Sequence, residues 1–239
     1  VAINSDGTQP FSWVLASFTE GGAALNCVQE VASDSCTVTR CTDPNPGAPV
    51  PLRFGAGTIT VEGDLRTAVV AYDGSRYVEP QASDFLYTAG AMVAFSASGS
   101  DRIDPFEGSV VAPARIQLTA PSLSPPFVID RTADLDLTWT GGGGGVLNVG
   151  VSGRASPEAA ESVSVDCEFD PTSGAATVPA VALAELPETS SGEFFAAVRE
   201  TKQIEVGDAS VLLAVQEEVK ADGPRGTASL SVANAVVIQ

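Results

Sequence analysis

Apolar and polar residues alternate along three segments in the second half of the chain. Every second residue is apolar in 135–139, 147–151 and 163–169, and most residues between them are Asp, Asn, Ser, Thr, Glu or Gly. A period of two places one set of side chains against a core and the other in water, as in the strands of a half-buried antiparallel sheet. Because breaks that contain Gly or Pro separate the three segments, the pattern predicts a β-sandwich or barrel.

Shorter apolar segments continue this plan toward both ends of the chain. Gly207-Asp208 separates two long strand-like segments and therefore predicts a hairpin. Residues 179–186 form the one segment with a helical pattern, since it begins with a proline and Pro187 stops it. We therefore expect an all-β fold. The further strands are expected at residues 11–18, 37–41, 58–62, 67–72, 76–78, 91–97, 109–112, 194–206, 209–219 and 228–238.

Prolines concentrate between residues 113 and 126, which makes this stretch the best candidate for a domain junction. A chain of 239 residues suits one large or two small domains, and similar numbers of strands are expected on each side of the junction. The sequence thus predicts two Ig-like antiparallel β-sandwich domains, residues 1–112 and residues 113–239. Residues 1–10 are polar and contain a proline, so we expect them to form an extended arm.

The four cysteines are Cys27, Cys36, Cys41 and Cys167. Their spacing does not match zinc motifs, which favours disulfides formed in an oxidising compartment. Cys36 and Cys41 differ in parity along one strand-like segment and so point to opposite faces. We expect Cys27 to pair with Cys36 or Cys41 and to pin a loop over residues 19–35 in the first domain. Cys167 faces inward, either as a small buried residue or as the partner of the remaining cysteine.

The formal net charge of −18 is spread over the whole chain and argues against some partners. Residues 1–112 carry 13 acidic and 5 basic residues, and residues 113–239 carry 17 and 7. Nucleic acids and anionic membranes bind basic patches, so neither is an expected partner. No apolar run reaches the roughly 18 residues that span a bilayer. The start of the chain lacks the features of a signal peptide, so we expect that any such peptide has been removed.

The chain contains no histidine. Nucleophile pairs of serine or cysteine with histidine, histidine-ligated zinc and a histidine general base are therefore excluded. The run Gly141–Gly145 is followed by a strand, whereas a phosphate-binding loop needs a helix and a Lys-Ser/Thr pair. We expect these glycines to form a flexible hairpin tip, or else a loop whose bare backbone contacts a neighbour. The expected protein is not an enzyme.

Two pairs of acidic residues are the remaining candidates for chemistry. Asp134 and Asp136 share the outward face of one expected strand, and Asp166 and Glu168 share that of another. Residues two apart on one face lie about 7 Å apart, a separation that suits paired acids. A strand surface that faces water explains both pairs, and Ca²⁺ binding is the sharper alternative. No other cofactor is expected.

A combination of motifs spans much of the second half. It reads D-L-x-L-x-W-T, a glycine-rich turn and V-x-V-x-V over residues 134–151, and then V-x-V-x-C-x-F, a turn and G-x-x-T-V-P-A-x-x-L-x-x-L over residues 163–186. The segments C-T-V-T-x-C and G-T-I-T-V-x-G of the first half accompany it. The combination resembles uncharacterised bacterial secreted proteins and lipoproteins with Ig-like sandwich folds. The resemblance implies the fold and an extracellular or cell-surface location, and it transfers no catalytic residue.

The expected function is therefore structural or adhesive, at the bacterial cell surface or outside the cell. Such a protein would be a subunit of a surface assembly that pairs an edge strand or a terminal arm with further copies or with other surface proteins. The alternative is a sandwich module that binds calcium through the acid pairs, or glycans through exposed aromatic side chains. The aromatic candidates are Trp13, Tyr72, Tyr77 and Tyr87.

Overall fold

The chain folds almost entirely into β-strands, as a computed structural model of it shows. The structure describes residues 2–5, 12–21, 26–42, 51–79, 84–122, 127–218 and 234–239. Within these ranges one short helix, α1 (Ala180–Leu183), interrupts the strands, and Pro179 precedes it as expected. The all-β prediction is confirmed.

The largest sheet has eleven strands. Nine of them follow one another in the order β4-β5-β16-β15-β18-β19-β1-β2-β9, while β20 pairs with β18 and β13 pairs with β20. Most neighbours are antiparallel, but β1 runs parallel to β19 and β13 runs parallel to β20. The strands are β1 (Ala2–Ser5), β2 (Ser12–Ala16), β4 (Asn26–Val31), β5 (Cys36–Thr42), β9 (Tyr77–Val78), β13 (Phe127–Ile129), β15 (Val146–Gly153), β16 (Glu161–Phe169), β18 (Thr189–Val206), β19 (Ala209–Glu218) and β20 (Asn234–Ile238).

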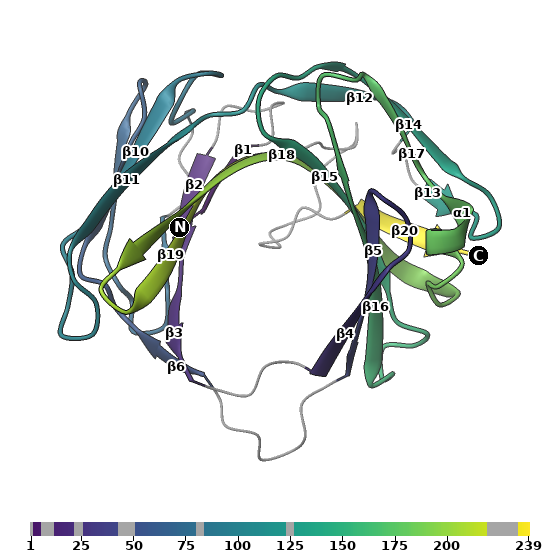
Figure 1. The fold of residues 1–239 in the computed structure, drawn as a ribbon, viewed down its shortest axis with the longest axis horizontal. Coiled ribbons are helices and arrows are strands. Elements are labelled where there is room, and N and C mark those ends of the chain that lie inside the picture. Colours follow the sequence, from purple (N-terminus) through teal and green to yellow (C-terminus); the bar gives the residue numbers. More distant parts are fainter. Residues whose placement is uncertain are drawn as a thin grey trace.

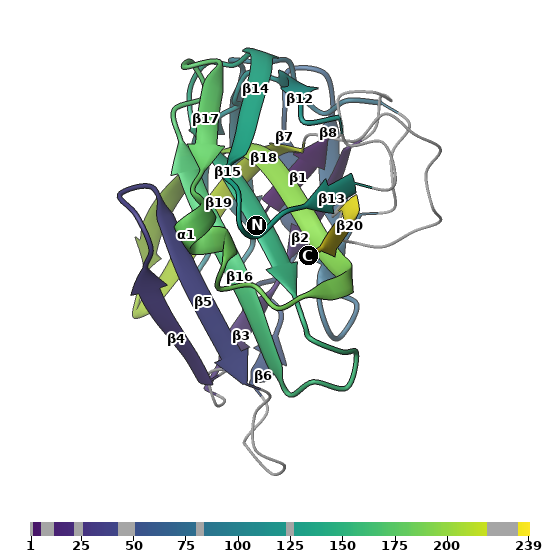
Figure 2. The same cartoon turned by 90° about the vertical axis from the view of Figure 1, so that its right-hand side faces the viewer.

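Three smaller sheets accompany the large one. Figure 1 shows the large sheet curving as an arch, with the four-stranded sheet outside one limb and the three-stranded sheet and α1 outside the other. Figure 2 faces the limb that carries α1. The four-stranded sheet is β11 (Phe106–Val111), β10 (Met92–Ala97), β7 (Ile59–Glu62) and β8 (Thr67–Val70); the three-stranded sheet is β12 (Ile116–Ala120), β14 (Leu135–Gly141) and β17 (Ala175–Val178); and the two-stranded sheet is β3 (Phe18–Glu20) and β6 (Leu52–Phe54).

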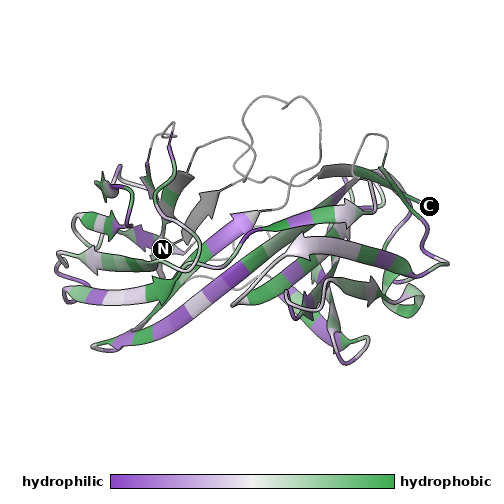
Figure 3. Cartoon of the chain, turned by 90° about the horizontal axis from the view of Figure 1, so that it is seen from above, coloured by the Kyte–Doolittle hydropathy of each residue, from purple (hydrophilic) through white to green (hydrophobic). Residues whose placement is uncertain are grey.

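Two hydrophobic cores separate the layers. Core 1 lies between β5, β16, β15 and β18 on one side and the three-stranded sheet on the other, and it includes Trp139 and Cys167. Core 2 lies between β19, β2 and the four-stranded sheet, and it includes Tyr77 and Phe95. Figure 3 shows hydrophobic and hydrophilic residues interspersed along the strands, as the two-residue period requires.

Each core takes residues from both sides of the expected junction. Val38 on β5 belongs to core 1, whose other members outside β5 lie at residue 127 or beyond. Val206 on β18 and Val211, Leu213 and Val215 on β19 belong to core 2, whose remaining members lie within residues 14–112. The division into two Ig-like domains at residues 112–113 stays a prediction. The cores do not follow it, because the hairpins β4–β5 and β18–β19 both cross over.

Two disulfides hold the β4–β5 hairpin. Cys27 pairs with Cys41 across the hairpin, and Cys36 pairs with Cys167 on β16. Cys36 is buried in core 1, whereas Cys41 lies on the other face of β5, as their parity predicts. The expectation of a pinned loop over residues 19–35 was wrong for residues 26–31, because β4 pairs with β5 over its whole length.

The two ends of the chain are internal strands. β1 pairs with β19 on one side and with β2 on the other. β20 pairs with β13 and with β18. The described part of the expected N-terminal arm, residues 2–5, therefore already has both edges paired within its own chain. A terminal arm that adds to a neighbouring molecule is not supported, which leaves the edge strands.

Candidate functional site

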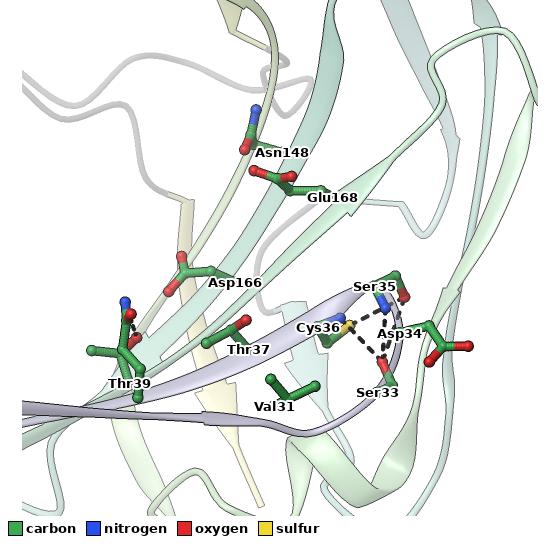
Figure 4. Close-up of a pocket in the computed structure, with 11 residues that line it drawn as sticks. Val31, Ser33, Asp34, Ser35, Cys36, Thr37, Thr39, Asn148, Asp166 and Glu168 are labelled. Carbon is green, nitrogen blue, oxygen red and sulfur yellow. Dashed lines mark hydrogen bonds between the residues drawn. The ribbon is translucent and has the colours of Figure 1, made fainter.

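A shallow polar depression of about 570 Å³ lies on the face of β4, β5, β16 and β15 that points away from core 1. Figure 4 shows the labelled side chains around it. The turn between β4 and β5 contributes Asp34 beside two serines. The lining residues are Gln29, Val31, Ser33, Asp34, Ser35, Cys36, Thr37, Thr39, Asn148, Asp166 and Glu168.

Asp166 and Glu168 both reach this depression from β16. Asp166 lies between Thr37 of β5 and Gly150 of β15, and its Oδ2 accepts a hydrogen bond from Ser164 Oγ at 2.7 Å. A Cβ atom at Gly150 would lie 3.2 Å from Asp166 Oδ1, so the missing side chain leaves room for the carboxylate. Glu168 lies opposite Asn148. The predicted pair therefore faces a common surface, as the alternation indicated.

The other acid pair serves local structure on the opposite side of core 1. The backbone N–H of Ala180 donates to Asp134 Oδ1 at 2.7 Å, at the first residue of α1. Thr177 Oγ1 donates to Asp136 Oδ1 at 2.7 Å across the β14–β17 pair. Asp136 faces away from core 1 on the three-stranded sheet, whereas Asp166 faces away from it on the large sheet. The four candidate residues therefore cannot converge on one ion.

The described residues offer little for a metal or a sugar platform. Among them, no three acidic, cysteine or histidine side chains are grouped so that they could hold a metal ion. Tyr77 and Tyr87 are buried in core 2, and Trp139 is buried in core 1, where its Nε1 donates to the carbonyl of Pro171 at 2.7 Å. These rings pack in the cores and are not available to a sugar, because burying a large apolar ring contributes strongly to stability. The side chain of Trp13 lies outside the described residues.

The outer edge of β4 is the second feature of this region. All six residues of β4 are exposed, and Val28 and Val31 are 61% and 82% exposed. β4 ends the order of the large sheet, and no described strand pairs with its other side. A regular strand with an unpaired side presents free N–H and C=O groups to another chain. We refer to this unpaired side of residues 26–31 as the β4 edge.

The disulfide fixes which backbone groups point outward at the β4 edge. The Cα atoms of Cys27 and Cys41 are 4.1 Å apart, the close spacing of an antiparallel pair that exchanges no backbone hydrogen bonds. Such pairs alternate with hydrogen-bonded pairs, so Gln29 and Val31 belong to the same class as Cys27. The N–H and C=O groups of these three residues therefore point to the free side. Their side chains lie on the face of the depression.

The sequence did not reveal the β4 edge. Residues 26–31 contain two valines but no clean alternation, and the nearest expected strand was residues 37–41. The signal that could have found it is the spacing of Cys27 and Cys41, since a disulfide that joins directly opposed residues implies a second strand in register.

The sequence matches no known protein family and no curated protein. A solved structure described as a Ca²⁺-stabilized adhesin that helps an Antarctic bacterium reach out and bind ice is similar at 11% sequence identity and a TM-score of 0.21. The alignment covers 89% of this chain and 57% of that chain. A likeness this weak carries no argument about fold or function. Within the described residues, no helix is long and apolar enough to cross a membrane.

Proposed function

We propose that this chain is a non-catalytic, extracellular structural or adhesive protein whose β4 edge joins it to a second copy. The free edge carries the proposal, since it is a six-residue strand in continuous register with β5 and has no lysine, no proline and no described covering strand. Natural proteins usually protect such edges by these means. The location is supported by the two disulfides, which persist in oxidising compartments, and by the resemblance to bacterial secreted proteins.

One antiparallel register of two β4 strands, centred on Gln29, sets no like charges directly opposite each other. When two antiparallel copies meet with Gln29 opposite Gln29, Cys27 of each copy lies opposite Val31 of the other across the two-fold axis. The outward N–H and C=O groups of these residues can then form hydrogen bonds between the copies. Glu30, the one charged residue of β4, then faces Val28 rather than its own copy. Like charges directly opposite would destabilise the pair, so this register avoids the main local penalty. It also covers the exposed side chain of Val31.

The charge of the chain opposes this association at long range. Two copies of net charge −18 repel each other, and added salt screens that repulsion. Self-association through the β4 edge should therefore strengthen as NaCl rises, which is opposite to the behaviour of an interface held by surface ion pairs.

The test is sedimentation velocity over a range of protein and NaCl concentrations. Gln29→Pro removes an outward N–H without removing a β4–β5 hydrogen bond, because the residue belongs to a non-hydrogen-bonded pair. We expect the wild type to associate and Gln29→Pro to weaken association at least tenfold, while the matched control Gln29→Ala retains it. A wild type that stays monomeric in high salt, or a proline variant that associates as well as the alanine variant, would overturn the proposal.

Carbohydrate binding at the depression is the second candidate. Hydroxyl, amide and carboxylate groups of Thr39, Asn148 and Asp166 line one surface, and these are the groups that hydrogen-bond to sugars. The described lining lacks an aromatic ring, so this candidate is the less supported of the two.

A further inference from the structure

The linker between the two outer sheets is enclosed on several sides. Residues 112–115 connect β11 of the four-stranded sheet to β12 of the three-stranded sheet. The five-glycine turn between β14 and β15 lies against this linker. The backbone N–H of Gly142 donates to the carbonyl of Arg115 at 3.0 Å, and that of Ala114 donates to the carbonyl of Gly143 at 2.9 Å. The turn therefore matches the second expectation, a loop whose backbone contacts a neighbouring segment, and not the first, a flexible hairpin tip, since β14 and β15 belong to different sheets.

The glycines are needed because backbone approaches them closely. Gly141 has a φ of +83°, and a Cβ there would lie 2.5 Å from the carbonyl oxygen of Arg115. Gly145 has a φ of +74°, and a Cβ there would lie 2.7 Å from the carbonyl oxygen of Arg199 on β18. Gly144 differs, since its φ is +71° but no atom lies within 4 Å of a Cβ position. Conformation and contact can therefore be separated by substitution within a single turn.

A buried charge meets the linker from the large sheet. Glu217 on β19 is 3% exposed and lies opposite Val198 of core 1, two residues beyond Val215 of core 2. Its Oε2 lies 3.4 Å from Nε of Arg115. The guanidinium of Arg115 also lies 3.9 Å from the centroid of the Phe85 ring, a cation–π distance. Only Glu217 of this ion pair is buried, since the side chain of Arg115 is 37% exposed. Loss of Arg115 would leave the buried carboxylate with its desolvation penalty.

Tyr87 adds a further contact from core 2. Its hydroxyl donates to the carbonyl of Gln216 at 3.5 Å, beside Glu217. Burial, and next the negative charge of Glu217, raise the pKa of Tyr87, so the phenol remains a neutral donor at physiological pH. Residues from both limbs of the arch thus meet at one place on the outer side of the β18–β19 hairpin.

We propose that Arg115, Glu217 and the glycine turn form a rigid joint that fixes the orientation of the two cores. Without it, the cores would be connected mainly through the strands of the curved large sheet, which can twist. With it, the linker is clamped between Gly141, Gly142 and Glu217, and the molecule moves as one curved body. The inference is independent of the β4 edge, because the joint lies within one chain.

Pulsed electron paramagnetic resonance on the full chain tests the joint directly. The four cysteines are all in disulfides, so two introduced cysteines can be spin-labelled selectively without reductant. Suitable positions are Val69 on β8 and Val181 on α1, which are 67% and 62% exposed and lie beside core 2 and core 1. For the labelled parent, V69C/V181C, we expect a single narrow distribution of label–label distances.

The comparison that decides is Gly141→Ala against Gly144→Ala. Both substitutions place alanine at a positive φ, but only the first drives a side chain into the linker. We expect Gly141→Ala and Arg115→Gln to widen the distribution at least twofold and Gly144→Ala to leave it unchanged. If Gly141→Ala does not fold, the test is the width of the distance distribution of Arg115→Gln compared with that of Gly144→Ala. A parent distribution already as broad as that of Arg115→Gln, or a variant that melts earlier without broadening, would overturn the joint.

Discussion

Core 1 and core 2 each lie between part of the large sheet and a smaller sheet, but different interactions stabilise them. The Cys36–Cys167 disulfide lies in core 1, where it links the neighbouring strands β5 and β16, which are 131 residues apart in the sequence. Core 2 contains none of the four cysteines and instead gathers aromatic rings. Phe18 contacts the rings of Phe54, Tyr77 and Phe106 at centroid distances of 5.9 to 6.1 Å, and Tyr72 lies 5.3 Å from Tyr77.

The difference follows from where the strands of each core come from. Core 1 takes β5 from a part of the chain that is remote in sequence, so a covalent link compensates for the entropy of closing a long loop. Apart from the tip of the β18–β19 hairpin, core 2 is built from residues 14–112, and its contacts are more local. Buried aromatic rings and their hydrogen bonds then stabilise core 2 without a disulfide. The two cores should therefore respond to different perturbations.

The largest expected effect is the loss of the core 1 disulfide. Cys36→Ala with Cys167→Ala should lower the free energy of unfolding of core 1 by about 3–5 kcal/mol. Without the disulfide the long loop is no longer closed, so the unfolded chain regains conformational entropy. Trp139 is 4% exposed in core 1 and reports its unfolding by fluorescence once Trp13 is replaced by Phe. Urea titration of this background, with and without the double substitution, measures the change.

The matched control for that variant is Cys27→Ala with Cys41→Ala. This disulfide closes only 14 residues on the exposed hairpin, so its loss should cost less. Hydrogen exchange in β7 and β10 should change little in either double variant, because these strands belong to core 2. Equal losses for the two variants, or loss of core 2 protection alone, would contradict the contrast between the cores.

The next effect concerns the tyrosines of core 2. The Tyr77 hydroxyl accepts from the N–H of Ala56 and donates to the carbonyl of Gly57, both at 2.6 Å. Tyr77→Phe leaves these buried groups unpaired and should lower the free energy of unfolding by about 1–3 kcal/mol. Tyr72→Phe is the matched control, since the structure shows no hydrogen-bond partner for the buried Tyr72 hydroxyl among the described residues.

Tyr72→Phe should change stability by less than about 0.5 kcal/mol or raise it, because removing an unpaired buried hydroxyl relieves a desolvation cost. Thermal unfolding of the two variants gives the comparison in one experiment. Equal destabilisation would show that the rings, and not the hydrogen bonds of Tyr77, hold this part of core 2.

Local pattern predicted the faces of the strands well but not their partners. The parity of Cys167, Val165 and Val163 placed them in a core, and the Gly207-Asp208 turn gave the β18–β19 hairpin. The position of β4–β5 beside β16 was not predicted, because alternation states which side of a strand is buried and nothing about which strand lies next to it. Pairing between remote segments depends on the summed packing of both.

The candidate residues show the same limit. Asp166 and Glu168 face one surface because they are two residues apart on a strand, and the sequence suffices for that. Asp134 and Asp136 have the same spacing, yet they lie on the opposite side of core 1, since β14 belongs to the covering sheet. Chemistry that needs both pairs could be excluded only after the layers were known.

The smallest expected effect is one that the two cores share. Hydrogen bonds from Thr132 and Thr172 lower the pKa of Asp130 and of Asp170, which flank core 1. Near core 2, hydrogen bonds from Thr88 lower the pKa of Asp64, and those from the backbone of Arg76 and Ser75 lower that of Asp73. In each case an exposed carboxylate accepts hydrogen bonds that stabilise its charged form.

A folded-state pKa below the unfolded value contributes stability above the unfolded pKa, near 3.8, and this contribution is lost as pH falls through the folded pKa. The free energy of unfolding should therefore decline below about pH 4. Asp130→Asn with Asp170→Asn should flatten this decline for core 1, and Asp64→Asn with Asp73→Asn should do the same for core 2, as urea titrations from pH 6 to pH 3 would measure. An acid slope that neither pair alters would mean that other carboxylates set the acid stability of both cores.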